Sequence, residues 1–185
     1  MTAGTQRDMA KHEFPRIQAG DIGFDAGVGL SGLLIRLGTK SPYGHCWVYH
    51  ELVAIGDDGA EYWDVVEAGP RQGVARQIRV TNPLKVVRLW QDEFTRADIL
   101  KMSASLVGCR YGWGEIVRIV CHLFGVQIRR WKDNPSRVIC SNHVAQSICA
   151  GIPSFGLYMR YLHNEIWPGE LAVTCDAFTW DTEVA

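Results

Sequence analysis

The chain has 185 residues, of which 47% are hydrophobic, so it can bury one sizeable core and falls within the size of a single domain. Nineteen Lys and Arg against 20 Asp and Glu give a formal net charge of -1, which argues against bulk attraction to nucleic acid or an anionic membrane surface. The six cysteines lack the spacing of a disulfide scaffold and contain no Cys-x-x-Cys pair, so most are expected to be buried free thiols.

The two ends are expected to lie outside a single domain that covers residues 17–175. Residues 1–16 predict a flexible or docking arm, and 176–185 predict a C-terminal tail. The N-terminus has no apolar segment, so we expect neither a signal peptide nor a membrane anchor, and synthesis in the cytoplasm. No stretch reaches the roughly 20 apolar residues of a membrane span, so no transmembrane segment is expected.

The first half of the domain predicts a sheet. Gly20-Asp21-Ile22-Gly23-Phe24 starts the ordered region, and the apolar spacing in 27–37 predicts a short helix. Breakers then separate four strand-like runs, which predict a meander. The expected strands are 46–55, 61–67, 74–80 and 84–89.

The second half predicts helices. Residues 95–107 form a helix with Thr95 as its N-cap, 115–124 form a second, and a third begins at Cys140 and stops at Gly151-Ile152-Pro153. The chain is therefore predicted to be an α+β protein with a central antiparallel sheet packed against helices.

Cys140 is the candidate nucleophile. It ends the β-branched run Val138-Ile139 and begins the helix Cys140-Ser141-Asn142-His143. Unpaired N–H groups and the helix dipole at that position favour the thiolate and lower the pKa of the thiol. The other cysteines fall within predicted strands or helices, after a glycine or near the tail, and are interpreted as packing residues.

His45 is the candidate base. It follows a turn, Ser41-Pro42-Tyr43-Gly44, and opens a strand that would hold its ring on a rigid element, with Gly44 clearing space beside the imidazole. His50 and His143 compete for this role. His143 lies one turn along the nucleophile's own helix, where it is poorly placed to take a proton across a cleft.

Glu67 is the candidate orienting partner of the base, because it ends the strand expected to pair with that of His45. Spacing alone leaves Asp64, Glu61 and Glu51 open as alternatives.

These motifs, in this order, resemble the circularly permuted branch of the NlpC-type papain-like superfamily, in which the histidine precedes the cysteine. The resemblance rests on Gly-Asp-Ile-Gly-Phe, Ser-Pro-Tyr-Gly-His, Val-Val-Glu-Ala, Ile-Cys-Ser-Asn and Trp-Pro-Gly-Glu-Leu-Ala, and spans roughly residues 19–175. It implies a papain-like fold with Cys140 as nucleophile, His45 as base and Glu67 as the third member. The chain departs from the family pattern at Cys46 and Asn142.

The sequence is therefore interpreted as a cysteine hydrolase that needs no metal or cofactor. Main-chain N–H groups at the helix start, with Tyr43 as side-chain donor, would hold the oxyanion, and Ser141 and Asn142 would border the substrate. The resemblance implies an amide or peptide bond of bacterial cell wall peptidoglycan as substrate. The absence of an export signal fits a phage tail enzyme bound to tail proteins in the virion, or a lysis enzyme.

Three alternatives remain open. The same branch resembles relatives of lecithin retinol acyltransferase, which implies a thiol acyltransferase or lipid amidase, with 116–126 and Trp113 lining an apolar groove. A non-catalytic structural or wall-binding module of a phage particle would use the fold alone. A zinc site from Cys140, His143, His45 and Cys46 is disfavoured because the spacing matches no zinc family.

Overall fold

A five-stranded antiparallel sheet forms the centre of the protein. The computed structural model describes residues 16–90, 92–123, 125–126, 136–161 and 166–178, and all elements named below lie in these ranges. The strand order is β4-β3-β2-β1-β5. The strands are β1 (Ile22–Asp25), β2 (His45–Ile55), β3 (Glu61–Gly69), β4 (Gly73–Val80) and β5 (Lys85–Val87). The predicted α+β class with a central antiparallel sheet is confirmed.

The last strand departs from the expected meander. β2, β3 and β4 follow one another as antiparallel hairpins, but β5 pairs with β1 at the opposite edge, with Val87 opposite Ile22. Leu84 N–H donates to the carbonyl of Phe24 as the chain enters this pairing. β5 thereby covers an edge of β1 and buries Val87 to 3% exposure, which removes a row of unpaired backbone groups from solvent.

Six helices accompany this sheet within the described residues. They are α1 (Gly29–Thr39), α2 (Glu93–Ser105), α3 (Trp113–Leu123), α4 (Cys140–Gly151), α5 (Pro153–Tyr161) and α6 (Pro168–Phe178). A two-stranded parallel sheet of β6 (Arg110–Tyr111) and β7 (Arg137–Val138) adjoins them.

The cap of α2 differs from the prediction. Asp92, not Thr95, is the N-cap, and its carboxylate accepts the Thr95 N–H at 2.8 Å and the Thr95 hydroxyl at 2.9 Å. A carboxylate at the N-cap reaches the third N–H of the helix, so α2 begins two residues before the predicted cap.

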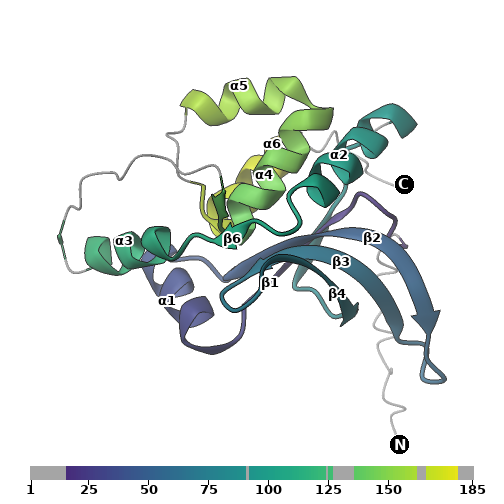
Figure 1. The fold of residues 1–185 in the computed structure, drawn as a ribbon, viewed down its shortest axis with the longest axis horizontal. Coiled ribbons are helices and arrows are strands. Elements are labelled where there is room, and N and C mark those ends of the chain that lie inside the picture. The colour runs from purple at the N-terminus through teal and green to yellow at the C-terminus, as the bar shows by residue number, and fades with distance from the viewer. Residues whose placement is uncertain (1–15, 91, 124, 127–135, 162–165, 179–185) are drawn as a thin grey trace, which may run out of the picture.

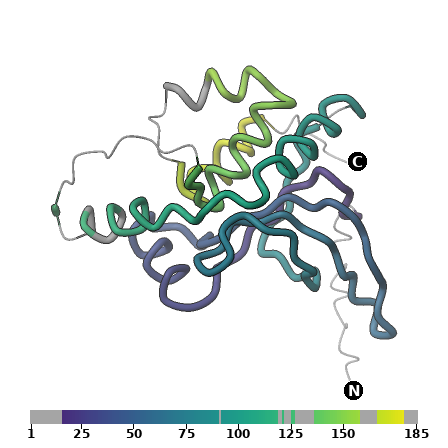
Figure 2. Tube along the Cα trace, in the orientation of Figure 1, coloured from purple at the N-terminus to yellow at the C-terminus, as the bar shows by residue number. Residues whose placement is uncertain are grey.

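The helices α2, α4, α5 and α6 gather over one face of the sheet (Figures 1 and 2). Side chains alternate between faces along each strand, so one set from every strand meets these helices. The fully buried Val144 and Ile148 of α4 pack in this cluster with Val48 and Val66 of the sheet. A smaller cluster of Trp47, Tyr49, Trp63 and Val65 lies on the opposite face.

The described part of the chain extends past the expected domain end at 175. α6 continues to Phe178, and Asp176 forms an ion pair with Lys85 of β5. Residues 1–15 of the expected arm and 179–185 of the expected tail lie outside the described residues. Among the helices that are described, none combines the length and apolar character needed to cross a membrane.

Candidate active site

Three elements bring Cys140, His45 and Glu67 together. His45 is the first residue of β2, Glu67 lies near the end of β3, and Cys140 is the first residue of α4. Glu67 is the register partner of Trp47, and because side chains alternate, Glu67, Trp47 and His45 share one face of the sheet. α4 packs against both β2 and β3 from the other face, and its first residue, Cys140, comes close enough to His45 at the start of β2 for a side-chain hydrogen bond.

The carboxylate of Glu67 holds the imidazole through one of its two ring nitrogens. Nε2 of His45 lies 2.8 Å from Oε2 of Glu67, and Nη1 of Arg79 donates to the same oxygen at 2.8 Å. Burial opposes the charged carboxylate, but the hydrogen bonds and positive charges of His45 and Arg79 outweigh it and lower the pKa of Glu67. The carboxylate therefore stays ionised beside the imidazole.

Arg79 was not identified from the sequence. It also donates to Asp25 at 2.8 Å and stacks over the ring of Trp47, with its guanidinium carbon 4.0 Å from the ring centroid. An arginine in an alternating strand is ordinarily a solvent-facing residue, so no local signal marks it. Only the pairing of β3 with β4 shows that it reaches Glu67.

His45 also forms a side-chain hydrogen bond with Cys140. Burial lowers the tendency of the imidazole to carry a proton. Hydrogen bonding to Cys140 and the charges of Cys140 and Glu67 act in the opposite direction and raise the pKa of His45 to about 10. The imidazolium is therefore the favoured form at neutral pH.

The thiol of Cys140 shifts in the complementary direction. The largest cause of the shift is a hydrogen bond from the Cys46 thiol, which lowers the pKa of Cys140. Burial raises this pKa, whereas the hydrogen bond and charge of His45 lower it further. Together they hold the pKa of Cys140 well below its usual range. Both shifts favour a thiolate–imidazolium pair.

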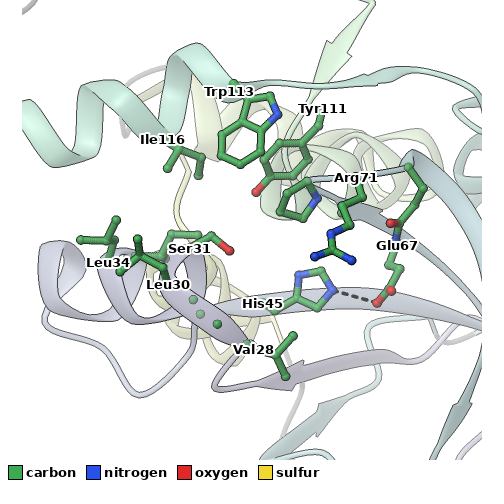
Figure 3. A pocket seen from close by; sticks show the side chains of 18 of the residues that line it. Val28, Leu30, Ser31, Leu34, His45, Glu67, Arg71, Tyr111, Trp113 and Ile116 are labelled. Carbon is green, nitrogen blue, oxygen red and sulfur yellow. Dashed lines mark hydrogen bonds and ion pairs between the residues drawn. The ribbon is translucent and has the colours of Figure 1, made fainter.

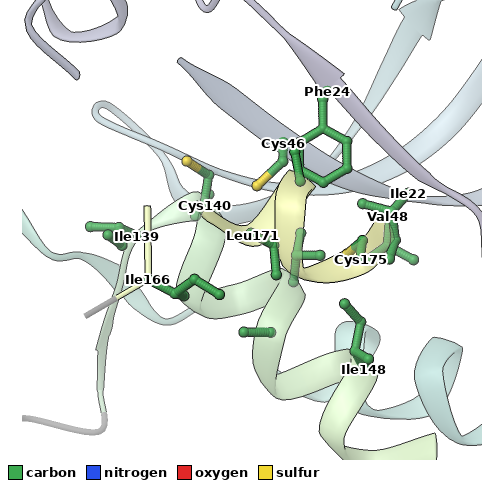
Figure 4. Close-up of a cluster of buried hydrophobic side chains, with 14 of the residues drawn as sticks. Ile22, Phe24, Cys46, Val48, Ile139, Cys140, Ile148, Ile166, Leu171 and Cys175 are labelled. Atoms are coloured by element: carbon green, nitrogen blue, oxygen red, sulfur yellow. The ribbon is translucent and has the colours of Figure 1, made fainter. Parts of the chain in front are cut away.

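Cys46 is thus beside the candidate nucleophile, although the sequence analysis interpreted it as a packing residue and a departure from the family pattern. The side chains of Cys46 on β2 and Cys140 on α4 lie next to one another (Figure 4), and both are buried. Burial, followed by hydrogen bonding to Cys140 and its charge, raises the pKa of Cys46. Cys46 therefore stays protonated and donates.

The start of α4 leaves backbone donors at the nucleophile. The N-cap Ile139 has an extended backbone and its side chain makes no cap hydrogen bond, and His143 N–H is the first in the helix to bond back to it. The three helical residues before His143 have N–H groups with no carbonyl partner inside the helix. They are available to a negative oxygen beside Cys140.

Gly44 has a different task from the one predicted. A Cβ at this position would lie 2.3 Å from the carbonyl oxygen of Ala26 and 2.9 Å from that of Gly32. The glycine therefore permits close approach of three backbone segments, the end of β1, α1 and the start of β2. It positions His45 through the backbone and does not clear space for the imidazole.

A pocket of about 700 Å³ opens onto this group (Figure 3). His45, Glu67 and Tyr111 are among its lining residues, whereas Cys140 is not. Tyr111 pairs with Val138 across β6 and β7, two residues before the nucleophile. Burial raises the pKa of Tyr111, and the negative charge of the Cys140 thiolate adds to this. The hydroxyl of Tyr111 thus stays protonated near the sulfur, as a candidate oxyanion donor.

The sequence analysis did not identify Tyr111, which lies two residues before the start of α3. Tyr43, the predicted donor, is half-buried with its ring centroid 5.6 Å from that of Phe24, and it does not line the pocket. The pattern that could have indicated Tyr111 is an aromatic residue directly before a glycine. This pattern alone does not show that Tyr111 lies near Cys140, because that depends on the pairing of β6 with β7.

Ser141 and Asn142 do not line the pocket either. Ser141 is fully buried, and its hydroxyl donates to the carbonyl of Ile166 at 2.6 Å. Asn142 is exposed and accepts a hydrogen bond from Gln146, one turn further along α4. The structure therefore gives the Ser141 hydroxyl a buried hydrogen bond to the backbone and places Asn142 on the outside of the helix.

The competing histidines sit elsewhere. Arg76 donates to Nδ1 of His50 at 3.2 Å, which leaves the proton of a neutral ring on Nε2, 3.1 Å from Oγ of Ser103. The same hydroxyl lies 3.1 Å from Nε2 of the fully buried His143. Burial lowers the pKa of both rings to about 4, so both are neutral.

In the described residues, no group of three or more His, Cys, Asp or Glu side chains is arranged to hold a metal ion. No protein-family model matches the chain, and no curated protein is significantly similar to it in sequence.

Proposed function

We propose that this protein is a cysteine hydrolase that cleaves amide bonds through a thioester with Cys140. The observation that supports this most directly is the convergence of Cys140, His45 and Glu67, with pKa shifts that favour a thiolate–imidazolium pair. A structural ion pair would not require a cysteine at the first position of a helix, where the backbone donors stabilise both the thiolate and a neighbouring oxyanion.

The first half of the reaction forms the acyl-enzyme. The thiolate attacks the carbonyl carbon, and the oxygen takes up the negative charge beside the N–H groups of the α4 start and the Tyr111 hydroxyl. His45 then gives its proton to the leaving nitrogen, the C–N bond breaks, and the amine departs. Glu67 and Arg79 keep the ring in place throughout.

The second half releases the product. Neutral His45 takes a proton from water, and the resulting hydroxide attacks the thioester carbon. The C–S bond breaks, a carboxylic acid leaves, and the thiolate and imidazolium are restored. The reaction consumes one water for each amide cleaved.

The proposed fold is that of a circularly permuted NlpC-type papain-like enzyme. Chain order and the α+β architecture support it, since His45 and Glu67 on the sheet precede the nucleophile helix. The proposed substrate is a peptide or amide bond of bacterial peptidoglycan, and the proposed context is a phage tail or a lysis enzyme. Sequence resemblance alone supports these two assignments.

One observation favours a second candidate, a thiol acyltransferase or lipid amidase. The pocket wall formed by α1 and α3 is apolar, and three of its side chains are largely exposed, namely Val28, Leu30 and Trp113. An acyl chain could occupy such a wall. N-acyl amides of long-chain fatty acids, assayed alongside cell walls, distinguish the two candidates.

The test is release of soluble fragments from isolated bacterial cell walls by the protein, with Cys140→Ala as control. New amino and carboxyl termini in equal amounts, absent with the control, are the expected result. In parallel, iodoacetamide at mildly acid pH should modify Cys140 first, because burial raises the pKa of Cys46 and Cys175. Preferential labelling of another cysteine, with no cleavage of either substrate, would leave only a non-catalytic role.

A further inference from the structure

The pocket beside His45 has two unlike walls. α1 and the start of α3 supply apolar side chains, whereas the β3–β4 hairpin, which includes Glu67, supplies polar ones, with His45 between the two walls (Figure 3). Two arginines, Arg71 and Arg79, belong to the polar wall.

These two arginines differ in what they contact. Arg79 donates to both Glu67 and Asp25 and stacks on Trp47, so its charge is already compensated. Arg71 is exposed and takes part in no hydrogen bond or ion pair with any residue of the described ranges. Its guanidinium points into the pocket between Tyr111 and His45 (Figure 3).

The turn that carries Arg71 is held in place at its base. Gly69 pairs with Gly73 across the hairpin, and Val74 exchanges hydrogen bonds of 2.9 Å with the backbone of Gly108 and Cys109. A Cβ on Gly73 would lie 2.2 Å from the carbonyl oxygen of Cys109, and its φ of +72° suits glycine. Because the turn is fixed, ordering Arg71 on a ligand costs less entropy than ordering a free loop.

An uncompensated guanidinium at the rim of a reactive pocket presents a planar fork of donors that matches a carboxylate. We propose that Arg71 binds a carboxylate of the substrate and selects anionic acyl compounds, whose apolar part lies on the opposite wall formed by α1 and α3. This inference rests on the proposed thiol chemistry of Cys140 and specifies the class of substrate. Arg71 is a specificity-determining residue, not a member of the reacting group.

The test compares two alkylating reagents that differ in charge, iodoacetate and iodoacetamide, with Cys140 modification measured by peptide mapping. Both reagents react with the same thiolate, so its intrinsic reactivity cancels in the ratio of the two rates. Arg71→Gln should lower the iodoacetate-to-iodoacetamide ratio by about three- to tenfold, as expected for a partly exposed charge-assisted contact. Arg71→Glu should lower it further, and added salt should shrink the difference between Arg71→Gln and wild type.

Arg137→Gln is the matched control, because Arg137 is also an exposed arginine but lies on β7 and does not line the pocket. It should leave the ratio unchanged. The same variants are then tested on peptide amides that differ only in glutamate against glutamine beside the scissile bond. Arg71→Gln should raise KM for the glutamyl compound alone, with kcat retained.

The outcomes separate this inference from the proposed function. An Arg71→Gln ratio equal to that of wild type overturns the role of Arg71 while leaving Cys140 as the nucleophile. Equal loss of both rates also overturns it, because the arginine would then act on the thiol and not on the anion. Failure of both reagents to modify Cys140 overturns the proposed function, and this inference with it.

Discussion

His45, which is partly buried, and His143, which is fully buried, both lie near the start of α4, yet their pKa values shift in opposite directions. The pKa of His45 is raised to about 10 and that of His143 is lowered to about 4. Burial opposes the charged form in both cases. The difference lies in the partners, because His45 faces the anionic groups of Cys140 and Glu67, whereas His143 faces the hydroxyl and carbonyl of Ser103. The charged partners, and not the extent of burial, therefore decide which imidazole has a pKa suited to catalysis.

The largest expected effect separates the two histidines by activity. His45→Ala should lower the rate of amide cleavage by about 10²- to 10⁴-fold, the usual cost of losing a general base. His143→Gln, which keeps an amide near the position of Nε2, should retain a substantial fraction of the rate. Both are measured on isolated cell walls and N-acyl amides, after circular dichroism shows that each variant is folded. A His143 variant that is the less active of the two would reassign the base.

The second effect concerns stability and pH. The folded state holds the pKa of His143 at about 4, against 6.5 for a free imidazole, so between these values the unfolded chain binds more protons. The stabilisation is present above pH 6.5 and is lost as the pH falls toward 4, with a loss on the order of 3 kcal/mol from this group. Urea unfolding from pH 7.5 to 4.0 measures it. The slope should be smaller in His143→Gln, and an identical slope would refute the assignment.

The third effect tests the anion beside His45. Glu67→Gln keeps the volume and an acceptor but loses the charge, so it should lower the pKa of His45 and the rate by roughly ten- to a hundredfold, the range of a charge-assisted hydrogen bond. Glu67→Ala should lose more, because it also removes a partner of Arg79, and Cys140→Ala should be the least active. The pH profile of the rate and the imidazole NMR titration provide the measurements. Wild-type behaviour of both Glu67 variants would make the carboxylate a bystander.

Much of this arrangement could be predicted from local patterns, because each piece is encoded within a few residues. The start of α4 at Cys140 follows from a β-branched run that gives way to a helical one, and the strand after His45 follows from apolar alternation. The identity of the partner strand was also accessible, since β2 and β3 are joined by a short turn.

What local patterns missed depends on contacts between segments far apart in the chain. The position of β5 beside β1 is a choice between two sheet edges that no short window encodes. Arg79 reaches Glu67 only through the register of β3 with β4, and Tyr111 reaches the site only because β6 pairs with β7. The cap of α2 was missed for a smaller reason, since Asp92 and Thr95 are both good caps and only side-chain geometry separates them.

The smallest expected effect concerns Cys46, which supplies the first cause of the lowered pKa of Cys140. Cys46→Ala removes the S–H donor and should raise the pKa of Cys140, whereas Cys46→Ser keeps a hydroxyl donor and should raise it less. The backbone N–H of Cys46 and the imidazolium of His45 remain in both variants. Because a thiol is a weak donor, we expect the alkylation rate at neutral pH to fall by less than about tenfold.

The measurement is the pH dependence of Cys140 alkylation by iodoacetamide. Cys175→Ala is the control, since Cys175 is another buried thiol in the same cluster and is not among the main causes of the shift at Cys140. If Cys46→Ala and Cys46→Ser both titrate as wild type does, the thiolate is held by His45 and the helix start alone. The contrast between His45 and His143 would then depend on the charged partners of His45 alone, and the Cys46 thiol would serve only as a packing group.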